Sequence, residues 1–300
     1  NTTNSLNKKI SWYIRSMKKT IKVRKYSGEL ADFDENKLIL SLKNARADHN
    51  LANEIVSKIE KELYDGMTTK EIYNKAFKLL KSKRRPSAAR YKLKKAIMEL
   101  GPSGFPFENF IGHIFRHDGY TTDVGVIMQG NCVTHEVDVL ACKEDKCYIV
   151  ECKYHNSQGK ANDVKIPLYI HSRYNDIKRQ LEQDKTNTYT NYQGWIFTNT
   201  RFTLDAIDYA KCAGLQLVSW DYPQDKSLKY RINKSKLFPI TALTSLTKRE
   251  KQVFLEQGVV LCKEIYEAPE LLHKNGFSKA RIKKIQDDIT DLCENHFSED

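Results

Sequence analysis

The stretch "YIVECKYHNSQG", residues Tyr148 to Gly159, begins like a buried β-strand, yet it carries Glu151 and Lys153 two residues apart. Successive side chains of a strand point to opposite faces, so these two charges share one face. Positions around them, such as Ile149 and Cys152, are apolar, which argues against the alternative of a solvated edge-strand pair. We therefore expect a carboxylate and an ammonium group side by side on a core strand.

The longer segment "HEVDVLACKEDKCYIVECKY" (135–154) predicts a β-hairpin whose turn is centred on Glu144-Asp145. A symmetric turn there places Asp138 opposite Glu151. Directly opposed Cβ atoms lie about 4.5–5.5 Å apart, and two carboxylates that close repel each other unless a proton or a cation intervenes. Hard oxygen ligands suit Mg²⁺ or Mn²⁺, so the hairpin predicts a divalent metal site at Asp138 and Glu151.

The chemistry of such a site suits phosphodiester cleavage. A divalent ion on Asp138 and Glu151 would polarise a phosphodiester and lower the pKa of its bound water. Lys153 would orient or deprotonate that water, or stabilise the charge that develops on phosphorus. Glu108 lies at the edge of the apolar stripe of the preceding predicted helix and could reach the same metal. These four residues are the candidate catalytic residues.

Asp138 followed by Glu151-Cys152-Lys153 resembles the D…ExK core of the PD-(D/E)XK nuclease superfamily. Three segments resemble the Mrr-type restriction endonucleases more narrowly: "GFPFENFIGHIFRHDGY", "HEVDV" and "GWIFTNTRFTLDAIDYAKCAGLQLVSWD". The resemblance covers about residues 102–222. It implies a restriction-endonuclease-like mixed sheet flanked by helices, with metal-dependent cleavage of DNA.

The chain departs from that family in the long insert "HNSQGKANDVKIPLYIHSRYNDI", which follows Lys153. Many relatives continue sooner into a helix that carries a glutamine. Gln158, Arg173 and Lys178 are the candidates for its equivalent. The start of the insert suggests a substrate-facing loop.

The composition is that of a globular protein with an excess of positive charge. The chain has 300 residues, 40% hydrophobic and 29% charged, which is enough for two or three domains. A formal net charge of +12 and a pI of about 9.2 favour a polyanionic partner such as nucleic acid or a nucleotide. A merely soluble basic protein is the alternative.

The seven cysteines include no CxxC pair, so we expect reduced thiols in a cytoplasmic protein and no zinc site. No apolar run approaches the ~18 residues of a membrane helix, and we expect no membrane partner.

The order of predicted elements indicates an α/β multidomain protein. A short β pair in "TIKVRKYSGELADF" precedes a mostly helical stretch to Leu100, and "GPSGFP" (101–106) has the composition of a linker. Helix and strand patterns then alternate as in a mixed sheet with flanking helices, and the chain is helical from Phe238. The expected domains are 21–101, 102–223 and 238–298, after an extension of uncertain status over 1–20.

The segment "VRKYSGELADFDENKLILSLKNA" (23–45) resembles an ATP-cone, the regulatory nucleotide-binding domain of ribonucleotide reductases, as do "YDGMTTKEI" (64–72) and "AARY" (88–91). The resemblance covers about 21–100 and implies binding of ATP or dATP. Six positions are implied as contacts: Val23, Arg24, Lys25, Lys37, Thr69 and Tyr73. Two lysines near a helix N-terminus agree with an anion site. Tyr26-Ser27 replaces the usual Arg-Asp, and a degenerate cone that serves only oligomer contacts is the alternative.

The segment "PELLHKNGFSKARIKKIQDDI" (269–289) resembles a helix-hairpin-helix module, although Ser278 stands where the second turn glycine is usual. Such modules offer backbone N–H groups and basic side chains to DNA phosphates. The candidate DNA contacts are Lys279, Arg281, Lys283 and Lys284. A helical packing or dimerisation domain is the alternative.

Together these features predict a metal-dependent DNA endonuclease of the restriction or antiviral-defence type, regulated by ATP or dATP and acting as a dimer or tetramer. A nucleotide-sensing transcriptional regulator, or a nuclease for RNA or branched DNA in repair, are the alternatives.

Overall fold

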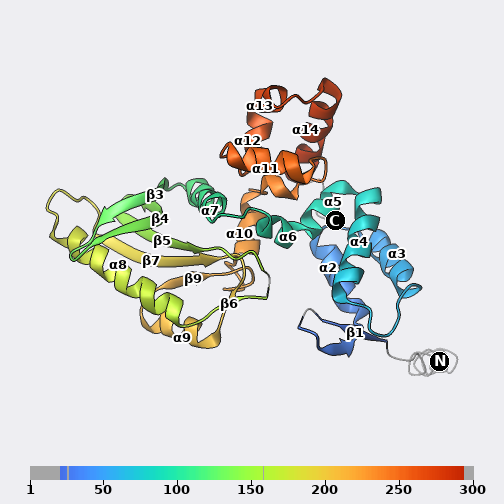
Figure 1. Cartoon of the computed structure of the whole chain (residues 1–300), viewed down its shortest axis with the longest axis horizontal. Coiled ribbons are helices and arrows are strands. Elements are labelled where there is room, and N and C mark those ends of the chain that lie inside the picture. Colours follow the sequence, from blue (N-terminus) through green and yellow to red (C-terminus); the bar gives the residue numbers. More distant parts are fainter. Residues whose placement is uncertain (1–20, 26, 158, 294–300) are drawn as a thin grey trace, which may run out of the picture. The chain divides into compact units, whose positions relative to one another are not determined.

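The computed structural model describes residues 21–25, 27–157 and 159–293 (Figure 1). The predicted extension over 1–20, Tyr26, the candidate Gln158 and the last residues of the C-terminal domain lie outside this part. The chain forms two compact units that divide between Tyr91 and Lys92, and each is described by itself. In the described residues, no helix is both long and apolar enough to span a membrane.

The first unit combines a β pair with a group of helices. Strands β1 (Lys22–Arg24) and β2 (Leu30–Asp32) are antiparallel. The helices are α2 (Glu35–Asn44), α3 (His49–Glu60), α4 (Thr69–Lys83) and α5 (Arg85–Tyr91). Helix α2 begins after Asp34, whose side chain accepts the Lys37 N–H as an N-cap. Thr68 and Glu71 form a capping box at the start of α4.

The second unit is built on a five-stranded sheet of order β3-β4-β5-β7-β9. The strands are β3 (Thr121–Gln129), β4 (Thr134–Lys143), β5 (Lys146–Lys153), β7 (Asn191–Thr198) and β9 (Gln216–Val218). The first three are antiparallel, and β5, β7 and β9 are parallel. Short strands β6 (Ala161–Asn162) and β8 (Arg201–Phe202) pair apart from it.

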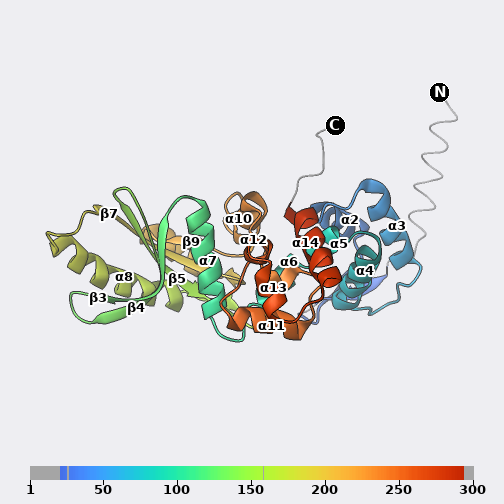
Figure 2. The same ribbon diagram turned by 90° about the horizontal axis from the view of Figure 1, so that it is seen from above.

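Helices cover both faces of this sheet (Figures 1 and 2). Helices α8 (Lys165–Gln183) and α9 (Leu204–Cys212) pack through Ile170, Tyr174 and Ala206 against Ile149 of β5 and its neighbours. Helix α7 (Phe105–His117) packs Phe115 against aromatic rings of β5 and β7. This arrangement is the mixed sheet with flanking helices that the sequence predicted.

The β4–β5 hairpin has the predicted register. Val139 pairs with Val150 and Cys142 with Cys147, as expected for a turn centred on Glu144-Asp145. Glu144 adopts a positive φ of 55°, which closes this tight turn. The strands that carry Asp138 and Glu151 are therefore direct neighbours.

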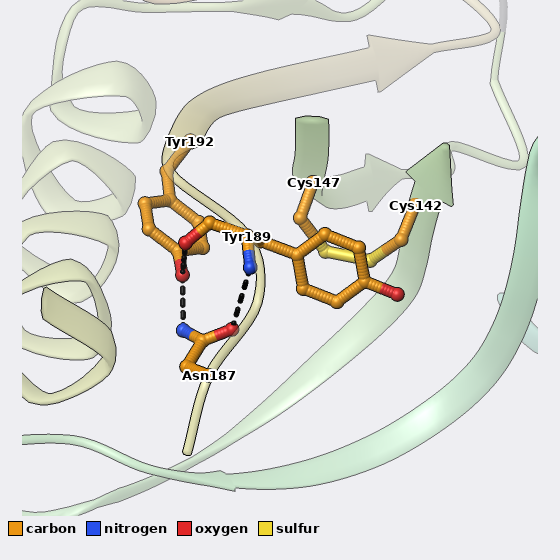
Figure 3. The surroundings of a disulfide bond; sticks show 5 residues. All are labelled: Cys142, Cys147, Asn187, Tyr189 and Tyr192. Atoms are coloured by element: carbon orange, nitrogen blue, oxygen red, sulfur yellow. Dashed lines mark hydrogen bonds between the residues drawn. A yellow bond between two sulfur atoms is a disulfide. The ribbon is translucent and has the colours of Figure 1, made fainter. Parts of the chain in front are cut away.

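A disulfide joins Cys142 and Cys147 across this hairpin, surrounded by Asn187, Tyr189 and Tyr192 (Figure 3). Asn187 accepts the N–H of Tyr189 at 3.1 Å and donates to the hydroxyl of Tyr192. Our expectation of reduced cysteines throughout is wrong for this pair, because the register places the two directly opposite each other.

The remaining helices complete the second unit. They are α6 (Leu93–Met98), α10 (Leu228–Ser235), a 3₁₀ turn η1 (Ile240–Ala242), α11 (Lys248–Glu256), α12 (Cys262–Glu267), α13 (Glu270–Lys274) and α14 (Lys279–Cys293). Phe254, Ile265, Leu272 and Ile285 are buried among them. The α/β multidomain class predicted from the sequence is thereby confirmed.

Candidate active site

Asp138 is fixed against β5 by its own side chain. The registered pairs of β4 and β5 run to Val139 and Val150, and Asp138 is the next residue of β4. Its Oδ2 accepts the Cys152 N–H at 2.6 Å, so the carboxylate takes the place of a backbone acceptor. This bond holds Asp138 beside the strand segment that carries Glu151 and Lys153.

Glu151 forms an ion pair with Arg173 of α8. The Nη1–Oε2 distance is 2.8 Å, and the side chains of Glu151 and Arg173 are only 12% and 16% exposed. Arg173 also donates to the backbone oxygen of Glu136, and its guanidinium lies over the Tyr169 ring, 5.6 Å from the centroid. Of the two candidates that the structure describes, Arg173 reaches the site, whereas Lys178 pairs with Glu182.

The carboxylates of the site raise one another's pKa. Burial, followed by the charge of Asp138, raises the pKa of Glu151 to about 7, while Arg173 and Lys153 oppose this shift. Burial also raises the pKa of Glu108 to about 7, and Asp138, Glu136 and Glu151 all add to it. Burial also raises the pKa of Asp138, although the hydrogen bond from the Cys152 N–H lowers it in part. Glu108 of α7 is thus within electrostatic reach of the strand carboxylates.

Lys153 lies half-buried beside these acids. Its charge lowers the pKa of both Asp138 and Glu151, which places it near them. In the described part of the chain, no carboxylate lies within ion-pair distance of its Nζ. The backbone oxygen of Lys153 accepts the Thr198 hydroxyl at 2.7 Å, so β7 fixes this end of β5. The ammonium group therefore remains available to a substrate or water.

The donor chemistry of this site fits a divalent cation. No group of three His, Cys, Asp or Glu side chains among the described residues stands ready-made as a metal-ligand set. However, the acids are hard oxygen donors whose mutual repulsion a cation would relieve. Among the hydrogen bonds of the described residues, none engages Asp138 Oδ1 or Glu151 Oε1. Asp138 and Glu151 are therefore the residues that would hold a metal.

The start of the insert after Lys153 is tied to the protein interior. His155 donates its backbone N–H to Asn199 Oδ1 at 2.9 Å and accepts from Asn199 Nδ2 at 2.8 Å. Its Nε2 lies 2.8 Å from Asn162 Oδ1. Two buried amides therefore hold His155 in place, and the expectation of a substrate-facing loop in this segment stays a prediction. In the sequence, the polar residues Thr198 and Asn199 at the end of β7 are the feature that indicates this contact with His155.

Comparison with known proteins identifies two domains in this chain. Residues 101–222 match the family model described as restriction endonuclease, and residues 21–94 match the ATP cone domain. A protein of Archaeoglobus fulgidus described only as uncharacterized is 31% identical over 176 residues, which cover 58% of this chain and 95% of that protein. Residues 101–222 therefore form a restriction endonuclease domain.

Solved structures also resemble this restriction endonuclease-like chain. A crystal structure of AF1548, a protein of unknown function, shares 29% identity with a TM-score of 0.52, over 64% of this chain and 98% of that one. The MspJI restriction endonuclease in complex with a 27-mer oligonucleotide shares 11% identity with a TM-score of 0.32, over 58% and 36% of the two chains. Residues 238–293 match a model described as AF1548-like, C-terminal.

In the ATP cone, β1 runs beside the start of α4. Arg24 donates its N–H to Met67 at 2.9 Å and forms a parallel bridge with Thr68, which brings Arg24 close to Thr69. Val23 is buried. These predicted nucleotide contacts therefore lie together.

The predicted phosphate-binding lysines of the ATP cone lie at its surface. Lys25 pairs with Glu29 at 3.1 Å, and Lys37, whose side chain is 84% exposed, pairs with Asp34 at 3.3 Å. The Tyr73 ring, one turn into α4, stacks on Tyr91 with centroids 5.0 Å apart. It belongs to the packing of α4 on α5.

The C-terminal cations divide into two groups. Arg281 forms a bidentate ion pair with Glu250 of α11, with Nη1–Oε1 and Nη2–Oε2 distances of 2.7 and 3.1 Å. Its guanidinium lies 4.7 Å from the centroid of the Phe277 ring. It therefore joins α14 to α11. Lys279, Lys283 and Lys284 are exposed on α14. The helix-hairpin-helix resemblance of this segment stays a prediction.

Proposed function

We propose that this chain is a metal-dependent DNA endonuclease of the restriction type, controlled by ATP or dATP at its ATP cone. The observation that carries the proposal is the meeting of Glu108, Asp138 and Glu151 beside Lys153, within a restriction endonuclease domain. The net charge of +12 suits a polyanionic substrate.

The side chains have separate roles in this proposal. Asp138 and Glu151 would hold Mg²⁺ or Mn²⁺, which would polarise the phosphodiester and lower the pKa of bound water. Lys153 orients the water that attacks phosphorus and stabilises the added negative charge. The attacking water gives up one proton to solvent, and the leaving oxygen takes up one from solvent as its bond to phosphorus breaks. Glu108, whose pKa is raised to about 7, is suited to hold or release a proton near neutral pH.

The regulatory part of the proposal rests on the cone. Nucleotide binding by Lys25 and Lys37 would shift an equilibrium between oligomers, a dimer or tetramer, and so control cleavage. A nuclease controlled in this way would act on foreign DNA in the cytoplasm, where both DNA and nucleotides are present.

A cleavage assay tests the proposal. Supercoiled plasmid, linear duplex, branched DNA and RNA are incubated with the chain, with and without Mg²⁺, Mn²⁺, ATP and dATP. We expect metal-dependent cutting of duplex DNA. Preferential cutting of RNA or branched DNA would show that duplex DNA is not the main substrate. Tight sequence-specific binding without any cutting would favour the alternative that the chain is a transcriptional regulator.

Matched variants test the catalytic assignment. Glu151→Gln and Asp138→Asn should each lower the cleavage rate by about 100- to 1,000-fold, because each removes a metal-binding charge. The controls are Glu144→Gln and Asp145→Asn, exposed acids at the turn of the same hairpin, which should cut normally. Full activity in the Glu151→Gln protein would refute the assignment.

A further inference from the structure

Two lysines of the second unit share one backbone acceptor. Lys251 of α11 donates Nζ to the Thr241 carbonyl at 2.8 Å, and Lys92, just before α6, donates to the same oxygen at 3.3 Å. Lys251 is only 7% exposed. The Thr241 hydroxyl in turn donates to the Ala96 carbonyl at 2.7 Å. This cluster therefore joins α6, η1 and α11.

The cluster holds more positive than negative charge. Glu99 is paired with Lys92 at 2.6 Å, so one carboxylate faces two ammonium groups. Burial, followed by repulsion from Lys92, lowers the pKa of Lys251 to about 7. The nearby Cys262 adds no charge, because burial raises the pKa of its thiol. A buried cation without its own counter-ion is unfavourable, and an anion would relieve it.

A cavity of about 300 Å³ lies beside this cluster. The polar residues that line it are Glu99, Asn156, Thr241, Lys248, Lys251 and Gln252. The lysines and amides can donate to an anion, whereas the carboxylate is already engaged by Lys92. The lining therefore favours a negatively charged ligand.

The wall of the cavity is connected to the candidate active site. Asn156 follows Lys153 by three residues, and Gly101 lines the same wall. Gly101 donates its N–H to the Tyr154 hydroxyl at 2.8 Å, and that hydroxyl donates to the Met98 carbonyl at 2.7 Å. A ligand here would contact the segment that leaves β5.

We propose that this cavity binds a small phosphate-type oxyanion through Lys248 and Lys251. The anion supplies the charge that balances Lys251 and ties α11 to the segment after Lys153. Its source is either a free phosphate-bearing molecule or a backbone phosphate of DNA. The inference rests on the charge and shape of the cavity, and it stands whether or not the chain cuts DNA.

The first test uses inorganic phosphate on the full chain, with chloride at matched ionic strength as the reference. The melting temperature should rise by about 2–4 °C when phosphate is about five-fold above its Kd. Lys251→Met should abolish this rise, and Lys248→Ala, at the exposed rim, should reduce it without disturbing the fold. Lys263→Ala, an exposed lysine of α12, is the control and should keep the rise. Phosphate bound by the ATP cone would contribute equally to all four proteins.

The second test identifies the source of the phosphate. Duplex DNA binding is followed by fluorescence anisotropy over a range of salt concentrations, without divalent metal. If the cavity takes a DNA phosphate, Lys248→Ala should reduce the slope of log K against log salt by about one. An unchanged slope together with the lost melting shift would indicate a free anion. An equal phosphate effect in wild type, Lys248→Ala and Lys251→Met, with unchanged DNA binding, would overturn the proposal.

Discussion

Glu151 depends on a partner 22 residues further along the chain, Arg173. The guanidinium opposes the rise in the pKa of Glu151 that burial and Asp138 cause. In the proposed mechanism Glu151 has to be ionised to bind a metal, and Arg173 would then act as a positioning and charge-balancing residue. This role follows from the ion pair and from the low exposure of both side chains.

Arg173→Ala should therefore move the pH dependence of cleavage. Without the guanidinium, the pKa of Glu151 rises further above its ordinary value of 4.5, and the acid limb of the pH–rate profile shifts upward by about one pH unit. The profile of Arg173→Lys should lie between those of wild type and Arg173→Ala. Arg179→Ala, an exposed arginine of the same helix, is the control. An unshifted acid limb in Arg173→Ala would show that Arg173 does not act on the ionisation of Glu151.

The strand register around Asp138 and Glu151 could be predicted from the sequence, whereas the ion pair of Arg173 could not. The register of β4 and β5, the strands that carry Asp138 and Glu151, could be predicted from the numbering of the hairpin alone, because a two-residue turn sets the register of both strands. Arg173 could only be one of three candidates. Its selection depends on how α8 packs on the sheet, which is a long-range property.

At the scale of elements, helix α11 carries a lysine, Lys251, at a buried position of the kind that is usually apolar. Lys251 is buried with its pKa lowered from 10.5 to about 7. Between these two values the unfolded chain binds more protons than the folded chain, so the free energy of unfolding rises as the pH rises from about 7 to 10.5. Below this window the unfavourable effect of Lys251 on stability is fully present.

Lys251→Met should remove this pH dependence. At pH 7 the free energy of unfolding should increase by roughly 1–3 kcal/mol, since a buried cation is replaced by an apolar side chain of similar length. Urea unfolding at pH 7 and at pH 10 measures the effect, with Lys248→Met as the exposed control on the same helix. A larger destabilisation of Lys251→Met at pH 7 than at pH 10 would contradict this account.

The elements themselves were largely predictable. Capping residues such as Asp34 mark helix starts by local hydrogen bonds, and alternating apolar residues mark β4 and β5. The absence of a CxxC pair and the expected compartment predict reduced thiols and so do not reveal the Cys142–Cys147 disulfide. The same register that predicted the metal pair also places Cys142 opposite Cys147.

At the scale of the whole molecule, nucleotide binding and DNA binding are assigned to different parts of the chain. Lys25 and Lys37 make exposed ion pairs within the ATP cone. Such pairs contribute about 0–1 kcal/mol, so a triphosphate can readily displace Glu29 and Asp34. The cone is thus suited to exchange these internal partners for a nucleotide.

Lys25→Ala and Lys37→Ala should each weaken binding of ATP or dATP by about ten-fold, since each removes a charged hydrogen bond to phosphate. Isothermal titration calorimetry measures the affinity. Lys43→Ala, near the other end of α2, should bind normally. Equal affinity in all these proteins would favour the alternative that the cone serves only as a contact between subunits.

The exposed lysines of α14 should bind DNA without reading its sequence. Replacing Lys279, Lys283 and Lys284 together by alanine should lower the affinity for every duplex alike and reduce the salt slope by about three. Anisotropy titrations check this, with Lys263→Ala as the control. We expect a smaller DNA effect from Arg281→Ala, because Arg281 is engaged by Glu250.

The sequence by itself determined the class of fold, the order of the domains and the pairing of β4 with β5. These depend on local periodicity, turn residues and short motifs, which act over a few residues. Only the tertiary structure decided that Arg173 meets Glu151, that Asn199 anchors His155 and that Lys92 and Lys251 share Thr241. These partners are 22, 44 and, for Lys92 and Thr241, 149 residues apart. Contacts of that range arise from the packing of whole elements, because no local pattern specifies which distant side chain will fill a given position.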